Sequence, residues 1–174
     1  MRVRRALVLI GIGGLLAVPT TAAAESGAPV ASANGGAHWT IELPNPFDVE
    51  VWNRTLSFNA RKYADGSVDG RFEYHQVVEG EAFKFNVDVT CMNVYDGNRA
   101  KIGGVIVVSN DPTLPPGMFA WFQVFDNGQG ADAPADESSL VGFGDELANE
   151  AFCNSPALPR FGPWDIQGNV QVLA

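Results

Sequence analysis

Phe83-Lys84-Phe85-Asn86-Val87-Asp88-Val89-Thr90-Cys91 is a stretch in which apolar and polar side chains alternate without interruption. Successive side chains of a β-strand point to opposite faces, so the stretch predicts a strand with one face covered by the rest of the protein. The residues expected on the covered face are Phe83, Phe85, Val87, Val89 and Cys91.

The flanking segments extend this strand into a meander from Arg54 to Asn127, which reads as five consecutive strands. Asp-Gly turns at 64–67 and 95–98 are predicted to join neighbouring strands, because glycine tolerates the positive φ angles of tight hairpins. The pair Gly103-Gly104 predicts a bulge or a sharp bend, the kind of irregularity by which sheets coil.

Shorter elements are predicted outside the meander. Residues 38–43 are expected to form a first short strand and residues 47–53 an irregular link. Residues 145–152 are predicted to make two helical turns and residues 168–173 a closing strand. The predicted fold is therefore all-β: an antiparallel up-and-down meander forming a small barrel or a flattened sandwich, with at most one short helix near the C-terminus.

The first 24 residues have the three parts of a secretory signal peptide. A basic start (residues 1–5) precedes an apolar run (6–18) and an Ala-x-Ala ending at Ala24. Glycine interrupts the run, which is shorter than the roughly 20 apolar residues of a membrane anchor. We expect cleavage after Ala24, secretion to the extracellular space and no membrane insertion of the mature chain.

The 150 residues that follow residue 24 suit one domain with a core of its own. Residues 25–36 are rich in Ser, Gly and Ala and are predicted to be a flexible leader. Residues 37–174 are predicted to form a single β domain.

The mature chain is strongly acidic. Removal of the leader and its three arginines leaves 8 basic and 20 acidic side chains, a net charge of −12. Nucleic acids and anionic membrane surfaces bind Lys/Arg patches, so neither is expected as a partner. A solvated acidic surface that aids solubility is the favoured interpretation.

Two cysteines are present, Cys91 and Cys153. An even pair in an exported chain predicts one disulfide, and two free buried thiols are the alternative. With only two further histidines, no zinc-binding spacing can be assembled.

Three groups of residues carry a resemblance to a known family. They are 56–61 with 64–67; 87–91 through 97–98 to 103–104; and 125–128 with Pro134 and Asp136. Over roughly residues 53–153 the chain resembles the uncharacterised small secreted β-rich proteins of actinobacteria and other bacteria, a family without known activity. The resemblance implies export in a bacterium and a compact β-fold, and it implies no activity, cofactor or site residues.

Motifs of nucleophilic catalysis are absent from the sequence. Such catalysis needs Ser or Cys with a His base oriented by a carboxylate. His75 is expected on the outer face of its strand, His38 lies close to the leader, and both cysteines are expected to be oxidised. A non-catalytic function is favoured, and an extracellular hydrolase using paired carboxylates is the alternative.

The acidic loop after residue 125 contains oxygen ligands that suit Ca²⁺, namely Asp126, Asn127, Asp132 and Asp136. Their spacing is not that of an EF-hand, and Asp-Asn-Gly is equally common in ordinary turns. A solvated loop without a cofactor is favoured, with calcium as the alternative.

Small barrels either fill their interior with side chains or enclose one small ligand. A packed structural or interaction module, with an unknown extracellular partner, is the favoured function. The alternative is a carrier of a small apolar ligand in the barrel mouth. Residues proposed to line such a cavity are Phe58, Phe72, Phe83, Phe85 and Trp121.

Overall fold

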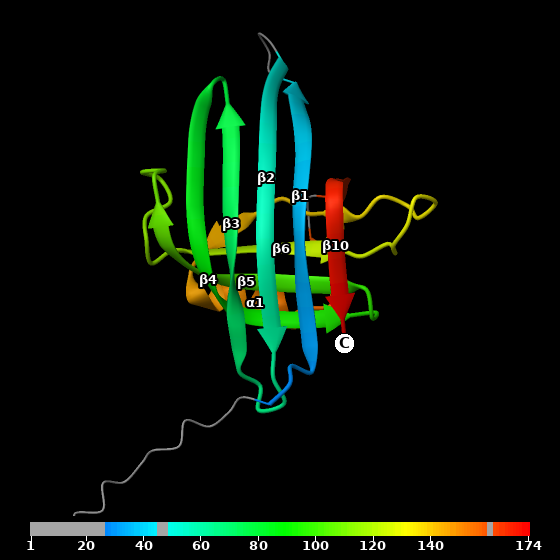
Figure 1. The fold of residues 1–174 in the computed structure, drawn as a ribbon. Helices are drawn as coiled ribbons and strands as arrows, with labels where there is room; N and C mark the ends of the chain where they lie inside the picture. Colours follow the sequence, from blue (N-terminus) through cyan, green and yellow to red (C-terminus); the bar gives the residue numbers. More distant parts are fainter. Residues whose placement is uncertain (1–26, 45–48, 160–161) are drawn as a thin grey trace, which may run out of the picture.

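The computed structural model describes residues 27–44, 49–159 and 162–174 (Figure 1). The predicted signal peptide, residues 1–24, lies outside this part of the chain. The elements in chain order are β1 (Ala31–Pro44), β2 (Val49–Lys62), β3 (Val68–Val78), β4 (Glu81–Tyr95), β5 (Arg99–Ser109), β6 (Phe119–Phe125), β7 (Glu137–Ser138), β8 (Gly142–Gly144), α1 (Glu146–Asn154), β9 (Trp164–Asp165) and β10 (Gln167–Leu173). In the described ranges no helix is long and apolar enough to cross a membrane.

The strands of the described residues form a single antiparallel sheet in the order β10-β1-β2-β3-β4-β5-β6-β7-β9, and β8 pairs with β6. Only Ile166 separates β9 from β10, so the two ends of the sheet lie close together and the meander is nearly closed as a barrel. The predicted all-β fold with one short C-terminal helix is confirmed.

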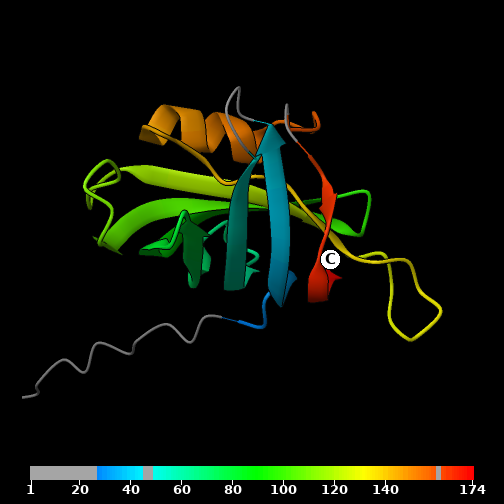
Figure 2. The ribbon, with the colours of Figure 1, turned by 90° about the horizontal axis from the view of Figure 1, so that it is seen from above.

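The barrel is flattened into two layers that cross steeply. β10, β1, β2 and β3 form one layer, while β5 and β6 run across it behind (Figure 1). β4 bends from the first layer into the second, and its pairing with β5 is shifted in register at two places. α1 covers the outer side of the second layer (Figure 2).

Both predicted Asp-Gly turns are present. Gly66 and Gly97 have φ angles of 87° and 81°, and Asp96 precedes Gly97 with a φ of 57°. Positive φ is cheap for glycine and costly for most other residues, so these positions fix the β2–β3 and β4–β5 hairpins.

Cys91 does not share the face of Phe83, and the prediction for this residue is wrong. The pairing of β4 with β5 skips from Val89–Gly104 to Cys91–Gly103, which leaves Thr90 as an extra residue. Such a bulge reverses the alternation that follows it. Met92 therefore enters the core at 2% exposure, and Cys91 turns outward toward α1. The irregularity lies opposite the glycine pair that predicted it.

β1 begins at Ala31, inside the segment 25–36 that was predicted to be a flexible leader. β2 begins at Val49, inside the predicted irregular link. The physical reason is pairing on both sides: β1 pairs with β2 along its whole length and with β10 over residues 32–38. Gly35 is needed there, because a side chain would collide with the backbone of Asn169. The small residues of segment 25–36, which led to the prediction of a flexible leader, allow β1 to pack closely against its neighbouring strands.

The interior between the layers is packed with side chains. The rings of Phe58 and Phe72 each make an edge-to-face contact with Phe122, with centroids 5.2 and 5.0 Å apart. All three side chains are at most 6% exposed. Edge-to-face aromatic pairs add to the free energy of burial, so the centre of the barrel is a solid core.

Candidate functional site

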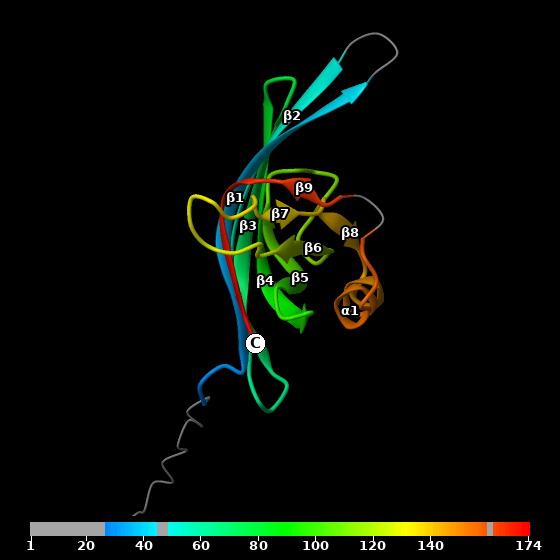
Figure 3. The same ribbon diagram turned by 90° about the vertical axis from the view of Figure 1, so that its right-hand side faces the viewer.

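A cleft of about 340 Å³ opens at the mouth of the barrel. One wall is the inner face of β2, β3 and β4, and the other is formed by the β5–β6 loop with the segment from Leu140 to Phe143. In Figure 3 the paired ends of β1 and β2 extend beyond the second layer on this side of the molecule. The apolar and aromatic lining residues are Trp52, Tyr74, Phe83, Phe85, Leu114, Leu140, Val141 and Phe143.

A buried arginine lies in this lining. Arg54 is 4% exposed, and its guanidinium carbon lies 4.6 Å from the centre of the Trp52 ring. Nε of Arg54 donates a hydrogen bond to Oε1 of Gln76 (3.1 Å). Nη1 is buried and has no hydrogen-bond partner, and no carboxylate of the described residues forms an ion pair with the guanidinium. Burial lowers the pKa of Arg54, and Tyr74 opposes this shift.

Tyr74 and Gln76 hold the guanidinium in place. The Tyr74 hydroxyl donates to the same Gln76 Oε1 at 2.9 Å. Burial raises the pKa of Tyr74 to about 12, although the nearby Arg54 cation lowers it. The hydroxyl therefore stays protonated at neutral pH and keeps donating to Gln76, whose oxygen is occupied on two sides.

A second donor without a partner lies in the same wall. Nε1 of Trp52 is buried and makes no hydrogen bond to any residue that the structure describes. Buried polar groups are normally satisfied, and these two donors of one cleft have no acceptor among the described residues.

The rim of the cleft carries an acidic residue that is hydrogen-bonded to neutral groups of a nearby residue. Oδ1 of Asp111 accepts hydrogen bonds from the backbone N of Thr113 (2.8 Å) and from its hydroxyl (2.6 Å). Of the lining residues that the structure describes, Asp111 is the only one with a carboxylate. A pair of carboxylates, which glycoside hydrolysis needs, is not found in this lining.

The predicted lining residues fall into three places. Phe83 and Phe85 line the cleft, Phe85 as part of the core cluster, whereas Phe58 and Phe72 belong to the core and do not line the cleft. Trp121 lies on the outer side of β6, with its ring 6.0 Å from that of Phe152 in α1.

Sequence reasoning missed Arg54, Gln76 and Trp52. A signal for Arg54 was present: Arg54, Leu56 and Phe58 alternate along β2, which places a charged residue on the inward face. A charge in an inward register marks a site worth testing.

The four residues of the proposed calcium loop do not converge on an ion site. Oδ1 of Asp136 accepts from the backbone N of Asn127 (2.9 Å), and its Oδ2 accepts from the backbone N of Val170 (2.7 Å). Oδ2 of Asp126 accepts from the backbone N of Val172 (3.0 Å), and Asp132 is exposed. In the described part of the chain no group of three or more His, Cys, Asp or Glu side chains is placed to hold a metal ion. The two carboxylates connect the loop to β10.

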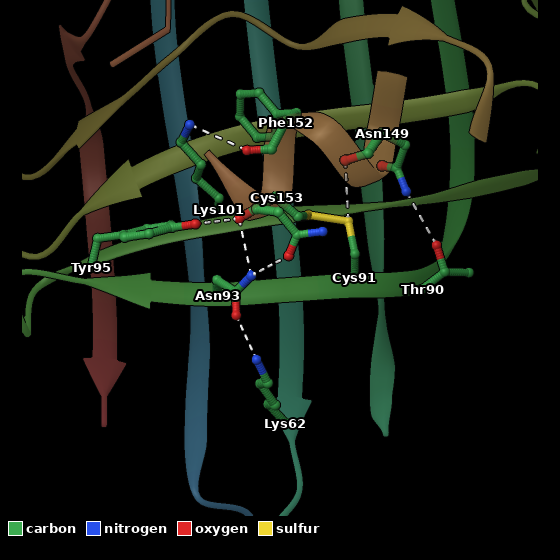
Figure 4. Close-up of a disulfide and its surroundings, with 10 residues drawn as sticks. Lys62, Thr90, Cys91, Asn93, Tyr95, Lys101, Asn149, Phe152 and Cys153 are labelled. Atoms are coloured by element: carbon green, nitrogen blue, oxygen red, sulfur yellow. Dashed lines mark hydrogen bonds between the residues drawn. A yellow bond between two sulfur atoms is a disulfide. The ribbon is translucent and has the colours of Figure 1, made fainter. Parts of the chain in front are cut away.

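α1 is held on the outer side of β4 and β5 by the predicted disulfide, which joins Cys91 to Cys153 (Figure 4). The hydroxyl of Tyr95 donates to the carbonyl of Cys153 at 2.6 Å. Nζ of Lys101 donates to the carbonyls of Phe152 (3.2 Å) and Ala157 (2.6 Å), and burial, followed by the nearby Arg99, lowers the pKa of Lys101. The buried cation satisfies carbonyls that the end of the helix leaves free.

Fold and cleft together define a small β-barrel-like protein with a packed centre and a largely apolar, ligand-sized cleft at its mouth. Comparison of the chain with protein-family models, with curated proteins and with solved structures found no match. A function is therefore proposed from the geometry of the cleft alone.

Proposed function

We propose that the protein is an exported, non-catalytic binding protein that takes one small, mostly apolar molecule into the cleft at the barrel mouth. The observation that carries this proposal is the cleft itself, which combines aromatic and aliphatic walls with two buried, unpartnered donors. Ligand sites typically have this composition: an apolar lining with a few placed polar groups.

The size of the cleft limits the ligand. At about 30 Å³ for each water-sized group, 340 Å³ accommodates about a dozen non-hydrogen atoms. The packed centre of Phe58, Phe72 and Phe122 supports a ligand held at the rim rather than in the middle of the barrel. The proposal thus combines the two functions considered from the sequence, a packed module and a carrier of a small apolar ligand, because the packed barrel has its binding site at the mouth.

Filling the cleft is expected to weaken binding. We expect 1-naphthamide or octanamide, two neutral molecules of suitable size, to bind the native protein in isothermal titration calorimetry. Leu114→Trp places an indole in the cleft and is expected to weaken binding by about tenfold or more. Val108→Trp is the matched control, because Val108 is 58% exposed and does not line the cleft.

Thermal denaturation of both variants separates loss of the cleft from loss of the fold. Equal binding by the native protein and by folded Leu114→Trp would contradict the proposed site. The proposed function would be contradicted if neither amide and neither of the two corresponding acids bound the protein at millimolar concentration.

Export to the extracellular space of a bacterium is part of the proposal. The leader at residues 1–24, the disulfide and the resemblance to secreted bacterial proteins support it. Intact-mass analysis of protein recovered outside the cytoplasm should give a chain that starts at or near Glu25. Full-length chain in the membrane fraction would contradict it.

A further inference from the structure

We infer that the molecule bound in the cleft carries a carboxylate, or an anion of similar planar shape, on an apolar body, and that Arg54 receives this anionic group. The inference rests on the proposed function and specifies the class of ligand.

The first argument is the cost of the free guanidinium. A buried charge without a partner destabilises a folded protein, and such groups are normally paired. Arg54 is 4% exposed, yet its one hydrogen bond to a side chain of the described residues, from Nε to Gln76, is to a neutral amide. An anion that enters the cleft would supply the charge that the described residues do not provide.

The second argument is geometry. Gln76 and Trp52 fix the guanidinium from two sides, by the hydrogen bond to Nε and by the ring 4.6 Å from the guanidinium carbon. Nη1 remains free to donate, and Nε1 of Trp52 is an additional donor without a partner. A carboxylate has two acceptor oxygens in one plane and can accept from such donors at once. The rigid fork of arginine suits this recognition better than the point charge of lysine does.

The third argument is selectivity. A cationic ligand would be repelled by Arg54, and a neutral ligand would leave the buried charge unpaired. Asp111 at the rim keeps its negative charge, because both donors from Thr113 are neutral. Among the described residues it forms no ion pair with Arg54, so the buried guanidinium remains without a counter-charge. The aromatic wall formed by Phe83 and Phe85 then contacts the apolar body of the ligand.

The test compares matched acids and amides. 1-Naphthoate and 1-naphthamide have the same shape and differ in charge at neutral pH, and octanoate and octanamide form a second pair with a linear body. In calorimetric titrations of the native protein we expect each carboxylate to bind at least about tenfold more tightly than its amide. Equal affinities within both pairs would overturn this inference and leave the proposed function standing, whereas a lack of binding by all four molecules would overturn both.

Arg54→Met tests the residue itself. The variant keeps the apolar stem and removes the charge, and Gln76 still accepts from Tyr74. We expect it to lose the preference for carboxylates while its melting temperature stays the same or rises, because an unpaired buried charge has been removed. Arg61→Met removes an exposed positive charge from the same strand and is expected to bind as the native protein does.

Arg54→Lys covers the case in which Arg54→Met does not fold. Lysine keeps the charge without the planar fork of arginine. We therefore expect Arg54→Lys to prefer carboxylates over amides less strongly than the native protein does and more strongly than Arg54→Met does. An undiminished carboxylate preference in a folded Arg54→Met, or in Arg54→Lys where the former does not fold, would overturn the assignment of Arg54.

Discussion

Removal of the Cys91–Cys153 disulfide is expected to lower the free energy of unfolding by about 2–5 kcal/mol. The bond joins residues separated by 62 positions. Without it, the unfolded chain regains the conformational entropy that closing this long loop had removed. In the chain-entropy model a loop of this length corresponds to about 4 kcal/mol. Cys91→Ala/Cys153→Ala is the suitable variant, because it leaves no buried thiol, and denaturant unfolding at neutral pH is the measurement.

The structure predicts where the loss is felt first. α1 is held by the disulfide together with hydrogen bonds from Tyr95 and Lys101. Without the covalent bond we expect amide hydrogens of α1 to exchange faster than those of β2 and β3, since local opening of the helix no longer strains a crosslink. Leu147→Ala is the control within α1, because this side chain is 76% exposed, and it should change stability by less than about 0.5 kcal/mol. A double variant as stable as Leu147→Ala would contradict the argument.

The sequence was most informative where one strand face is uniformly apolar. The period-two pattern of β4 and the two Asp-Gly turns identified strands and hairpins, because both depend on nearby residues alone. The alternation failed at Cys91, where the bulge at Thr90 shifts the phase by one residue. The glycine pair in β5 predicted an irregularity, and the adjacent apolar residues Cys91 and Met92 were a sign of it within β4 itself.

The candidate site was less predictable because its two walls come from distant parts of the chain. Phe83 and Phe85 were identified as lining residues by their strand pattern. The opposite wall, from the β5–β6 loop and the Leu140–Phe143 segment, has no periodicity that indicates where it packs. Arg54 was visible as a charge in an inward register, but its lack of a counter-charge is a property of the assembled barrel.

The role of the acidic loop could not be predicted from the sequence either, because it depends on contacts with a distant part of the chain. Its Asp and Asn residues suit an ion, a turn or a backbone contact equally well when read locally. The partner of Asp136 is an amide in β10, 34 residues further along the chain. Only the closure of the barrel brings the two together.

Asp136 takes the place of a neighbouring strand for β10. This strand is last in the sheet order, so its side away from β1 has no strand partner. The carboxylate of Asp136 accepts from Val170 N, and the backbone carbonyl of Asp136 accepts from Ile166 N (2.9 Å). Asp126 continues the row by accepting from Val172 N. The acidic loop thus replaces part of the missing ladder and closes the barrel.

Asp136→Ala is therefore expected to lower the free energy of unfolding by about 3–6 kcal/mol, because two hydrogen bonds to a charged group contribute about 1.5–3 kcal/mol each. The side chain is 5% exposed, so water cannot easily replace the lost acceptors for Asn127 N and Val170 N. The stability of Asp136→Asn should lie between those of the native protein and of Asp136→Ala, since the single carbonyl oxygen of Asn can accept well from only one of the two amides.

Asp132→Ala, at an exposed position of the same loop, is the matched control and should change stability by less than about 0.5 kcal/mol. Denaturant unfolding gives the three values, and amide exchange at Val170 reports the closure directly. If Val170 stays as protected in Asp136→Ala as in Asp132→Ala, the barrel is closed by contacts other than this carboxylate.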